Sequence, residues 1–281
     1  MFTQSDTKYH SISYGDYGVT LMLKLLCWKD PILGGNKFYK LKNNLIQAQK
    51  LGIGHLVTVG GAYSNHLAAT ARAGRNYGFH TTGIVRGETI DNHTLKRAQL
   101  DGMRLVFVTR KVYMNRYQDG FAESVLERTP DWLFIPEGGA NSLGLDGCAE
   151  ILEPLDETFD LVAVCCGTGT TAAGMMRQLK EHQMLWGFSV LRDQGTLDKW
   201  IVNEPRAAII REFDFGGYAR KNDVLERYCH DFYMKHAIRI EPVYTGKMLF
   251  GIEKMIRDGR IARGTKVLAI HTGGLQYLEP D

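Results

Sequence analysis

The chain has 281 residues, of which 44% are hydrophobic, so it is long enough for one large or two modest domains with buried cores. Its 34 lysine and arginine residues and 31 aspartate and glutamate residues give a net charge of +3, too near neutral to indicate a nucleic-acid partner. The N-terminus has no apolar signal-peptide core, and no run of roughly 18 apolar residues indicates a membrane span. We therefore expect a soluble, cytoplasmic protein that does not bind a membrane.

The cysteines fit the same compartment. Their number is odd, no two have Cys-x-x-Cys spacing, and no His-x-x-x-His pair accompanies them. We therefore expect neither a metal site nor a disulfide framework, and free thiols are typical of a reducing cytoplasm. The cysteines are Cys27, Cys148, Cys165, Cys166 and Cys229.

Short apolar stretches alternate along the chain with helical patterns. Continuous apolar strands that end in glycine or a polar residue and lead into a helix are typical of parallel sheets covered on both faces. This pattern predicts the α/β class, and the break between residues 139 and 161 predicts two sheets. Ligands bind beyond the carboxyl ends of such strands, where this chain has glycine-rich loops. The predicted strands are 55–61, 81–88, 104–109, 132–139, 161–169, 185–193 and 266–274.

Two lysines stand in the first turn of a helix predicted from Asn36, at the helix end that repels cations. Lys37 lies at the edge of the apolar stripe of this helix, and Lys40 points away from it. Burial and the positive helix end both favour a neutral amine on Lys37, the form that Schiff-base chemistry needs. The alternative is that Lys37 reaches solvent along an apolar surface. The stripe consists of Phe38, Leu41, Leu45 and Ala48.

The segment GGAYSNH (60–66) joins a predicted strand to a predicted helix. Ser64 or Asn65 can cap that helix. The functional alternative places the Ser64 hydroxyl and the Asn65 amide against a ligand. We expect His66 in the first helical turn rather than as a catalytic base.

The loop GTGTT (167–171) follows an apolar strand and opens a helix. Backbone amides at a helix start, together with three hydroxyls, form a cradle for a phosphate group. No Gly-Lys-Ser/Thr follows, so the loop is not a P-loop. It also matches Gly-x-Gly-x-x-Ala through Ala172, with Asp193 after the next predicted strand, so a nicotinamide-dinucleotide site is the alternative.

Two further segments lie near the C-terminus. Tyr244 and Thr245 begin a predicted helix, where a buried tyrosine can also serve only in packing. Thr272 stands at the end of the last predicted strand and is expected at the same edge as the other loops.

Taken in order, these motifs resemble those of the pyridoxal-phosphate enzymes that comprise 1-aminocyclopropane-1-carboxylate (ACC) deaminase and D-cysteine desulfhydrase, with the tryptophan-synthase-β-like fold (fold type II). The resemblance extends from about residue 33 to residue 276. The chain departs from the family in the short segment before Lys37 and in GGYARKND (216–223), where a proline-containing sequence is usual. The matching motifs are GGNK (34–37), GGAYSNH (60–66), IPEGGANSLG (135–144), GTGTTAAGM (167–175), PVYTGK (242–247) and HTGG (271–274).

The resemblance implies a site for pyridoxal 5'-phosphate. Lys37 would form the Schiff base with the cofactor, Asn65 would contact its ring hydroxyl, and Thr245 would face its pyridine nitrogen. Lys40 matches a second lysine of the family, to which we assign no role. The phosphate would be held by Gly167, Thr168, Gly169, Thr170 and Thr171.

The resemblance also implies a substrate site and a domain organisation. Ser64 would lie beside the substrate carboxylate, and Tyr244 and Tyr218 would flank the substrate. The small domain would span residues 51–140, and the large domain would combine residues 1–50 with 141–281. The protein would act as a homodimer.

We interpret the chain as a lyase or hydrolase of amino-acid metabolism that removes ammonia, with or without sulfide, from a small amino acid. ACC deaminases have a glutamate in Tyr-Glu-Gly-Lys, and its carboxylate keeps the pyridine nitrogen protonated and the ring a strong electron sink. A threonine hydroxyl can only hydrogen-bond a neutral nitrogen, so Thr245 favours β-elimination of the D-cysteine desulfhydrase type. For Thr245, the alternative is that it only caps its helix and that substrate choice is set elsewhere. For the function, the alternatives are an ACC deaminase, a nicotinamide-dinucleotide oxidoreductase, and a relative that binds ligand without turnover.

Overall fold

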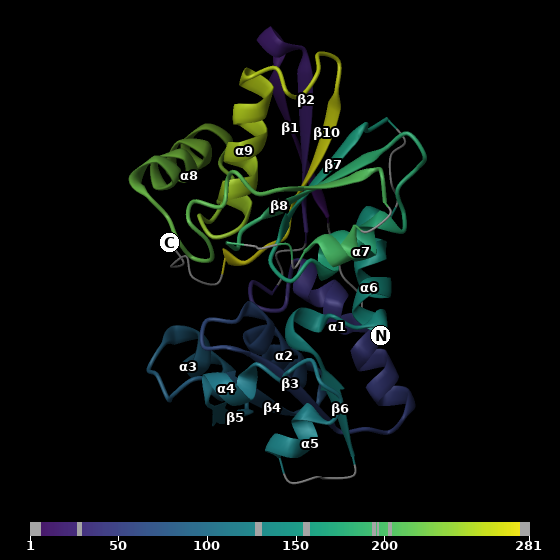
Figure 1. The fold of residues 1–281 in the computed structure, drawn as a ribbon, viewed down its shortest axis with the longest axis vertical. Coiled ribbons are helices and arrows are strands. Elements are labelled where there is room, and N and C mark those ends of the chain that lie inside the picture. The colour runs from purple at the N-terminus through teal and green to yellow at the C-terminus, as the bar shows by residue number, and fades with distance from the viewer. Residues whose placement is uncertain are drawn as a thin grey trace. The chain divides into compact units, whose positions relative to one another are not determined.

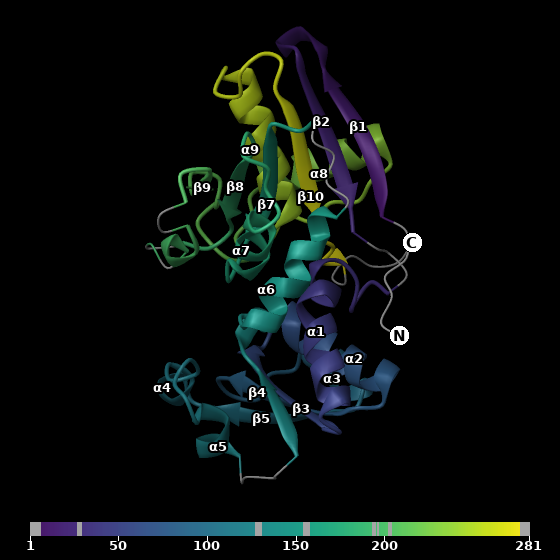
Figure 2. The ribbon, with the colours of Figure 1, turned by 90° about the vertical axis from the view of Figure 1, so that its right-hand side faces the viewer.

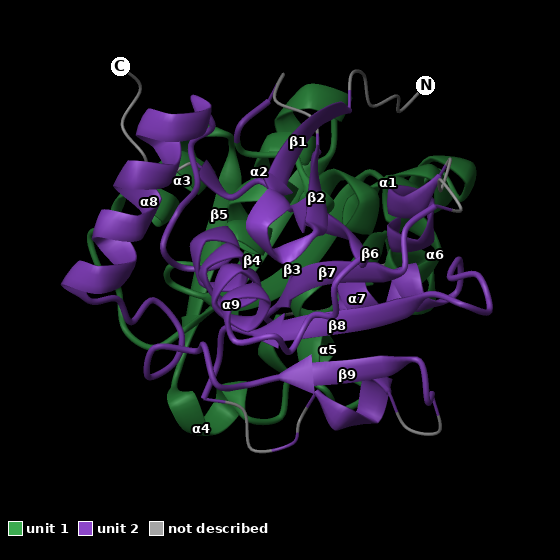
Figure 3. Ribbon diagram, turned by 90° about the horizontal axis from the view of Figure 1, so that it is seen from above, with its two compact units in different colours: residues 1–3, 32–147 green, residues 4–31, 148–281 purple. Residues whose placement is uncertain are grey.

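The computed structural model describes residues 7–26, 30–126, 131–153, 158–192, 195, 197–201 and 204–275. They form an α/β fold with two mostly parallel sheets, which confirms the predicted class (Figure 1). Each sheet belongs to one of two compact units (Figure 3). Unit 1 is built from residues 32–147, and unit 2 from the described parts of 4–31 and 148–281. No helix within the described ranges is long and apolar enough to cross a membrane.

Unit 2 contains a six-stranded sheet with the order β1-β2-β10-β7-β8-β9 (Figure 2). The edge strand β1 pairs antiparallel with β2, and the remaining strands are parallel, so the carboxyl ends of β7 and β10 are neighbours. The strands are β1 (Lys8–Tyr14), β2 (Val19–Leu25), β7 (Leu161–Cys166), β8 (Met184–Ser189), β9 (Ala207–Ile210) and β10 (Lys266–His271).

Helices cover both faces of this sheet, and for that reason its central strands are continuously apolar. Leu161, Ala163 and Cys165 belong to the same core cluster as the inner faces of α8 and α9, whereas the alternate residues of β7 point to the other face. Figures 1 and 2 show α8 and α9 on one face and α7 on the other. The helices of unit 2 are α7 (Thr170–Met176), α8 (Asp223–His236) and α9 (Thr245–Arg257), with 3-10 turns at Gly15–Tyr17, Glu150–Leu152 and Asp198–Trp200.

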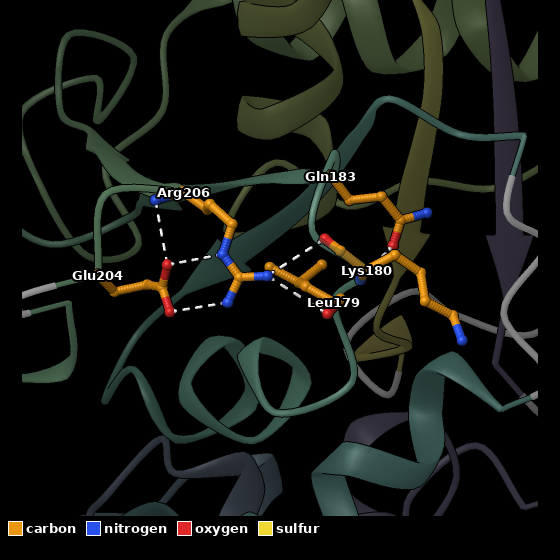
Figure 4. Close-up of polar contacts among 5 residues, drawn as sticks. All are labelled: Leu179, Lys180, Gln183, Glu204 and Arg206. Atoms are coloured by element: carbon orange, nitrogen blue, oxygen red, sulfur yellow. Dashed lines mark hydrogen bonds and ion pairs between the residues drawn. The ribbon is translucent and has the colours of Figure 1, made fainter.

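Arg206, the residue before the edge strand β9, joins this strand to the segment that follows α7 (Figure 4). Arg206 binds the two carboxylate oxygens of Glu204 through Nε at 2.9 Å and Nη2 at 3.0 Å. Its Nη1 donates to the backbone oxygens of Leu179 at 3.4 Å and Lys180 at 3.2 Å. The Arg206 side chain therefore links the segment after α7 to the start of β9.

Unit 1 contains a parallel four-stranded sheet with the order β5-β4-β3-β6. One face packs against α2 and α3, and the other packs against α4 and α5. The strands are β3 (His55–Gly61), β4 (His80–Arg86), β5 (Met103–Val108) and β6 (Trp132–Ile135). The helices are α1 (Asn36–Lys50), α2 (Asn65–Tyr77), α3 (His93–Leu100), α4 (Arg110–Tyr113), α5 (Phe121–Val125) and α6 (Ser142–Ala149), the last of which crosses the unit boundary, with a 3-10 turn at Glu137–Gly139.

The unit boundary differs from the predicted domain boundary in the position of α1. Residues 1–50 and 141–281 were expected in the large domain, whereas α1 and residues 141–147 belong to unit 1. The buried Asn44 explains this packing, because it exchanges hydrogen bonds of 3.4 and 2.8 Å with Asn141 in the loop after β6.

Helix α6 contains two glycines that let backbones approach closely. A Cβ atom on Gly147 would lie 2.0 Å from the Tyr39 carbonyl oxygen, and one on Gly144 would lie 2.0 Å from the Gly139 carbonyl oxygen. Both neighbours are backbone atoms, which cannot turn aside as a side chain can.

We therefore expect Gly147→Ala to lower the free energy of unfolding by about 1–3 kcal/mol or more, the usual cost of overpacking. Urea unfolding measures the change. Gly54→Ala is the control, because a Cβ atom there meets nothing within 4 Å. Equal stability of the two variants would contradict the close packing of α6 on α1.

Candidate active site

Lys37 is the second residue of α1, as predicted. Gly35 precedes the helix with φ of 67°, a conformation that favours glycine, and this sharp entry sets the direction of the first turn. The predicted apolar stripe of α1 is buried, and Lys37 itself is half-buried. Its Nζ donates to Asn36 Oδ1 at 2.8 Å. The amine is therefore held at the start of the helix rather than extended into solvent.

The prediction for Lys40 is wrong. The helical projection pointed this lysine away from the interior, but the residue is only 5% exposed. Its position next to the glycine turn after β6 explains the burial, because a Cβ atom on Gly139 would lie 3.1 Å from Lys40 Cβ. Two lysines of the first turn are thus drawn inward, and both lie near His66.

His66 is the second residue of α2 and is fully buried, in the first turn as expected. Thr58 donates its hydroxyl hydrogen to the Ile135 carbonyl at 2.7 Å, so His66 Nε2, 3.0 Å from that hydroxyl, must be the N–H donor. Its Nδ1 has no hydrogen-bond partner among the described residues. Burial, followed by the charges of Lys40 and Lys37, lowers the pKa of His66 to about 3. The ring is therefore neutral at physiological pH.

Ser64 and Asn65 lie at the start of α2, directly after β3. Ser64 is the N-cap residue, and its Oγ accepts the Leu67 amide at 3.3 Å, which confirms the capping role. This cap uses one lone pair of the hydroxyl and leaves its hydrogen available to a ligand. Asn65 is the first helical residue and is buried.

The loop of residues 167–171 joins β7 to α7 in unit 2. Gly169 is the N-cap residue with φ of 85°, and the Thr168 and Thr170 hydroxyl oxygens lie 3.1 Å apart. Trp200, which the sequence analysis missed, donates its indole N–H to the Thr168 carbonyl at 2.8 Å. A Cβ atom on Gly169 would lie 2.2 Å from the indole ring, so the glycine lets Trp200 support the loop.

Tyr244 and Tyr218, which the resemblance implied on either side of the substrate, pack against each other. Their ring centroids lie 5.9 Å apart with an interplanar angle of 71°, an edge-to-face geometry. Tyr244 also lies against the loop after β7, because a Cβ atom on Gly167 would meet its ring at 3.5 Å. Burial, with Tyr218 as the next cause, raises the pKa of Tyr244 well above its usual value, so its phenol stays protonated.

The start of α9 is capped by Glu241 and not by Thr245, so the capping alternative for Thr245 is wrong. The Glu241 carboxylate accepts the amides of Val243 at 2.7 Å, Tyr244 at 2.8 Å and Thr245 at 2.7 Å. Burial raises the pKa of Glu241 to about 7. The three amides and the nearby Thr245 hydroxyl act in the opposite direction and lower this pKa, but burial has the larger effect. That hydroxyl is fully buried and makes no well-formed hydrogen bond with any described residue.

The loops after β7 and β10 meet at one edge of the unit 2 sheet, as predicted. The sulfur of Cys165, the penultimate residue of β7, lies 3.3 Å from the Thr272 hydroxyl, which follows β10. Cys148, Cys165, Cys166 and Cys229 are free and buried. Cys27 lies outside the described residues.

The predicted site residues thus fall into two sets, each brought together within one unit. Unit 1 places Lys37, Ser64 and Asn65 at two helix starts, and unit 2 places Tyr218, Tyr244, Thr245 and the loop 167–171 around the start of α9 and the end of β7. Taken separately, each set has groups that suit pyridoxal 5'-phosphate: unit 1 has an amine at a helix start, and unit 2 has an amide-rich loop with hydroxyls. The dinucleotide alternative relied on Asp193, which lies outside the described residues.

Comparison with known proteins gives the same assignment. The family model described as "Pyridoxal-phosphate dependent enzyme" matches residues 4–192. A putative ACC deaminase of Thermotoga maritima is 30% identical over 92% of this chain and 90% of its own length. A bifunctional D-cysteine desulfhydrase/ACC deaminase of Arabidopsis thaliana, described as mitochondrial, is 28% identical over 92% of this chain and 73% of its own.

A solved structure of an ACC deaminase homologue shares the fold. It superposes with a TM-score of 0.80 at 25% identity, covering 97% of this chain and 90% of its own. Family, relatives and fold agree with the resemblance seen in the motifs. This chain therefore belongs to the pyridoxal-phosphate-dependent enzyme family and groups within it with ACC deaminases and D-cysteine desulfhydrases.

Proposed function

We propose that Lys37 bonds covalently to the aldehyde of pyridoxal 5'-phosphate and that Asn65 contacts the ring hydroxyl of this cofactor. The phosphate would lie on the amides and hydroxyls of Gly167, Thr168, Gly169, Thr170 and Thr171. Thr245 would face the pyridine nitrogen. Family membership supports this assignment, and so does the Thr245 hydroxyl, which is buried without a well-formed hydrogen bond.

When bound, the cofactor withdraws electrons from the bonds at the α-carbon of an attached amino acid. The Lys37 amine, once released, would take the proton from that carbon. Ser64 would donate its hydroxyl hydrogen to the substrate carboxylate, since its cap on Leu67 uses only a lone pair. Tyr218 and Tyr244 would flank the substrate, and the protonated phenol of Tyr244 would act as a donor rather than as a charge.

We favour β-elimination of the D-cysteine desulfhydrase type, and Thr245 is the observation that carries this choice. A hydroxyl at this position stabilises a neutral pyridine nitrogen, which makes a weaker electron sink than a protonated one. Elimination tolerates a weak sink because loss of the α-proton is coupled to departure of a thiolate. Lys37 would accept the α-proton while the Cβ–S bond breaks and the sulfur leaves as hydrosulfide. With one water, D-cysteine would yield a 2-oxo acid, ammonia and hydrogen sulfide.

ACC deamination is the second candidate, because the relative from Thermotoga maritima carries that name and the relative from Arabidopsis thaliana carries both. The ACC substrate has no α-hydrogen and no ready leaving group, so its ring opening needs the stronger sink. We further propose that the protein works in the cytoplasm as a homodimer, as the resemblance implies. The free, buried thiols of the four described cysteines agree with a reducing compartment.

Borohydride reduction of the yellow holoenzyme should fix the cofactor on Lys37. Peptide mass spectrometry locates the label. Lys40→Met is the matched control, because it removes the neighbouring lysine and should leave the label in place. A label on Lys40, or a protein that binds no pyridoxal phosphate, would refute the assignment and favour a ligand-binding relative without turnover.

Turnover of D-cysteine and of 3-chloro-D-alanine should each exceed turnover of ACC by about tenfold or more, equivalent to about 1.4 kcal/mol of barrier. Thr245→Glu should narrow this difference by supplying a carboxylate, and Thr245→Ser should preserve it. Side-by-side assays of ammonia release measure the three rates. Faster turnover of ACC than of both eliminating substrates in the wild type would overturn the choice of reaction.

A further inference from the structure

Lys247 is a buried cation to which the mechanism above gives no role. It is the third residue of α9 and is 0% exposed. Its Nζ donates to two backbone carbonyl oxygens, those of Asp214 and Gly217, both at 2.7 Å. The two carbonyl oxygens thus form a small site for a cation, and the Lys247 ammonium fills it.

The segment that supplies these carbonyls has an unusual backbone. It consists of two linked turns, closed by hydrogen bonds from the Gly217 amide to Asp214 at 3.0 Å and from the Arg220 amide to Gly217 at 3.1 Å. Phe215 and Ala219 have φ of 51° and 55°, which residues with a Cβ atom rarely adopt. The segment therefore needs anchors outside itself.

Two anchors on α9 hold the segment. Phe213 and Phe215 pack edge-to-face on Phe250, with ring centroids 6.4 and 5.2 Å from it. The second anchor is the Lys247 ammonium, one of whose acceptors is the residue before Tyr218. Tyr218 packs against Tyr244, the residue before α9. The positions of both tyrosines therefore depend on the start of α9.

We propose that Lys247 is a positioning residue, whose ammonium occupies the carbonyl site of Asp214 and Gly217 and so holds Tyr218 against Tyr244 for substrate binding. The proposal rests on the proposed function in one respect, namely that Tyr218 contacts the substrate. A neutral side chain at this position would take away one of the two donors that each carbonyl has among the described residues, and would leave each with only the backbone amide that closes its turn. The effect would fall on substrate binding because Tyr218 directly follows the anchored carbonyl.

Two carboxylates lie near the Lys247 ammonium and partly offset the effect of its burial. Burial lowers its pKa, while the carboxylates of Asp214 and Glu241 oppose that change. The other fully buried lysine of unit 2, Lys24, makes a useful comparison. Its Nζ donates to the Ile151 carbonyl at 2.6 Å, and burial lowers its pKa to about 8 with no carboxylate to oppose it. Lys24 therefore supports a different segment and serves as the matched control.

The test compares Lys247→Met with Lys24→Met in the full-length protein, with and without pyridoxal phosphate. Both variants lose a buried lysine and should lose stability. Only Lys247→Met should speed tryptic cleavage after the exposed Arg220, by about tenfold, because cleavage follows local opening of the turns. Mass spectrometry of the first fragments measures this rate without any turnover. Cleavage at the wild-type rate, or equal acceleration in Lys24→Met, would overturn the anchoring.

Steady-state kinetics with D-cysteine tests whether the anchor acts through Tyr218. Lys247→Met should raise KM by roughly tenfold, as expected for a misplaced contact. In a Tyr218→Ala background the same substitution should raise KM no further. Independent, multiplicative effects would overturn the proposed route through Tyr218. Accelerated cleavage with no turnover in the wild type would support the anchor and refute the proposed function, so the two failures are distinguishable.

Discussion

The first turn of α9 depends on a buried carboxylate at its entry and a buried ammonium within it. Glu241 accepts the backbone amides of Val243 and Tyr244, which lead into the helix, and of Thr245, its first residue. Lys247 places a cation where the helix dipole disfavours one, and two carbonyls stabilise it. Together these side chains define the directions of Tyr244 and Thr245 and the path of the segment that carries Tyr218.

Lysines also stand near the start of α1, where Lys37 is the second residue and Lys40 the fifth. There no carboxylate caps the helix, and the N-cap residue is a glycine with positive φ. The positive end of a helix disfavours the charged form of a lysine, which suits an amine that we propose acts as a nucleophile and a base. We thus propose different roles for lysines at the two helix starts. Lys37 takes part in the chemistry, and Lys247 holds a backbone segment in place.

Much of this architecture could be predicted from the sequence, because parallel strands buried on both faces are continuous apolar runs. The predicted strands correspond to β3 to β8 and β10. Strand β1 was missed because it is a mostly exposed edge strand, β2 because Lys24 interrupts its apolar run, and β9 because it has only four residues. Lys40, Glu241, Lys247 and Trp200 could not be predicted, since their partners are backbone groups or residues distant in the sequence.

The central claim is that Thr245 leaves the pyridine nitrogen of the cofactor without a proton. Glu241 lies near this hydroxyl, but its carboxylate is already committed to three amides. The most direct measurement is the ¹⁵N NMR shift of pyridoxal phosphate labelled at the ring nitrogen and bound to the wild type and to Thr245→Glu. The account predicts a neutral nitrogen in the wild type and a protonated one in the variant. A protonated nitrogen in the wild type would contradict it.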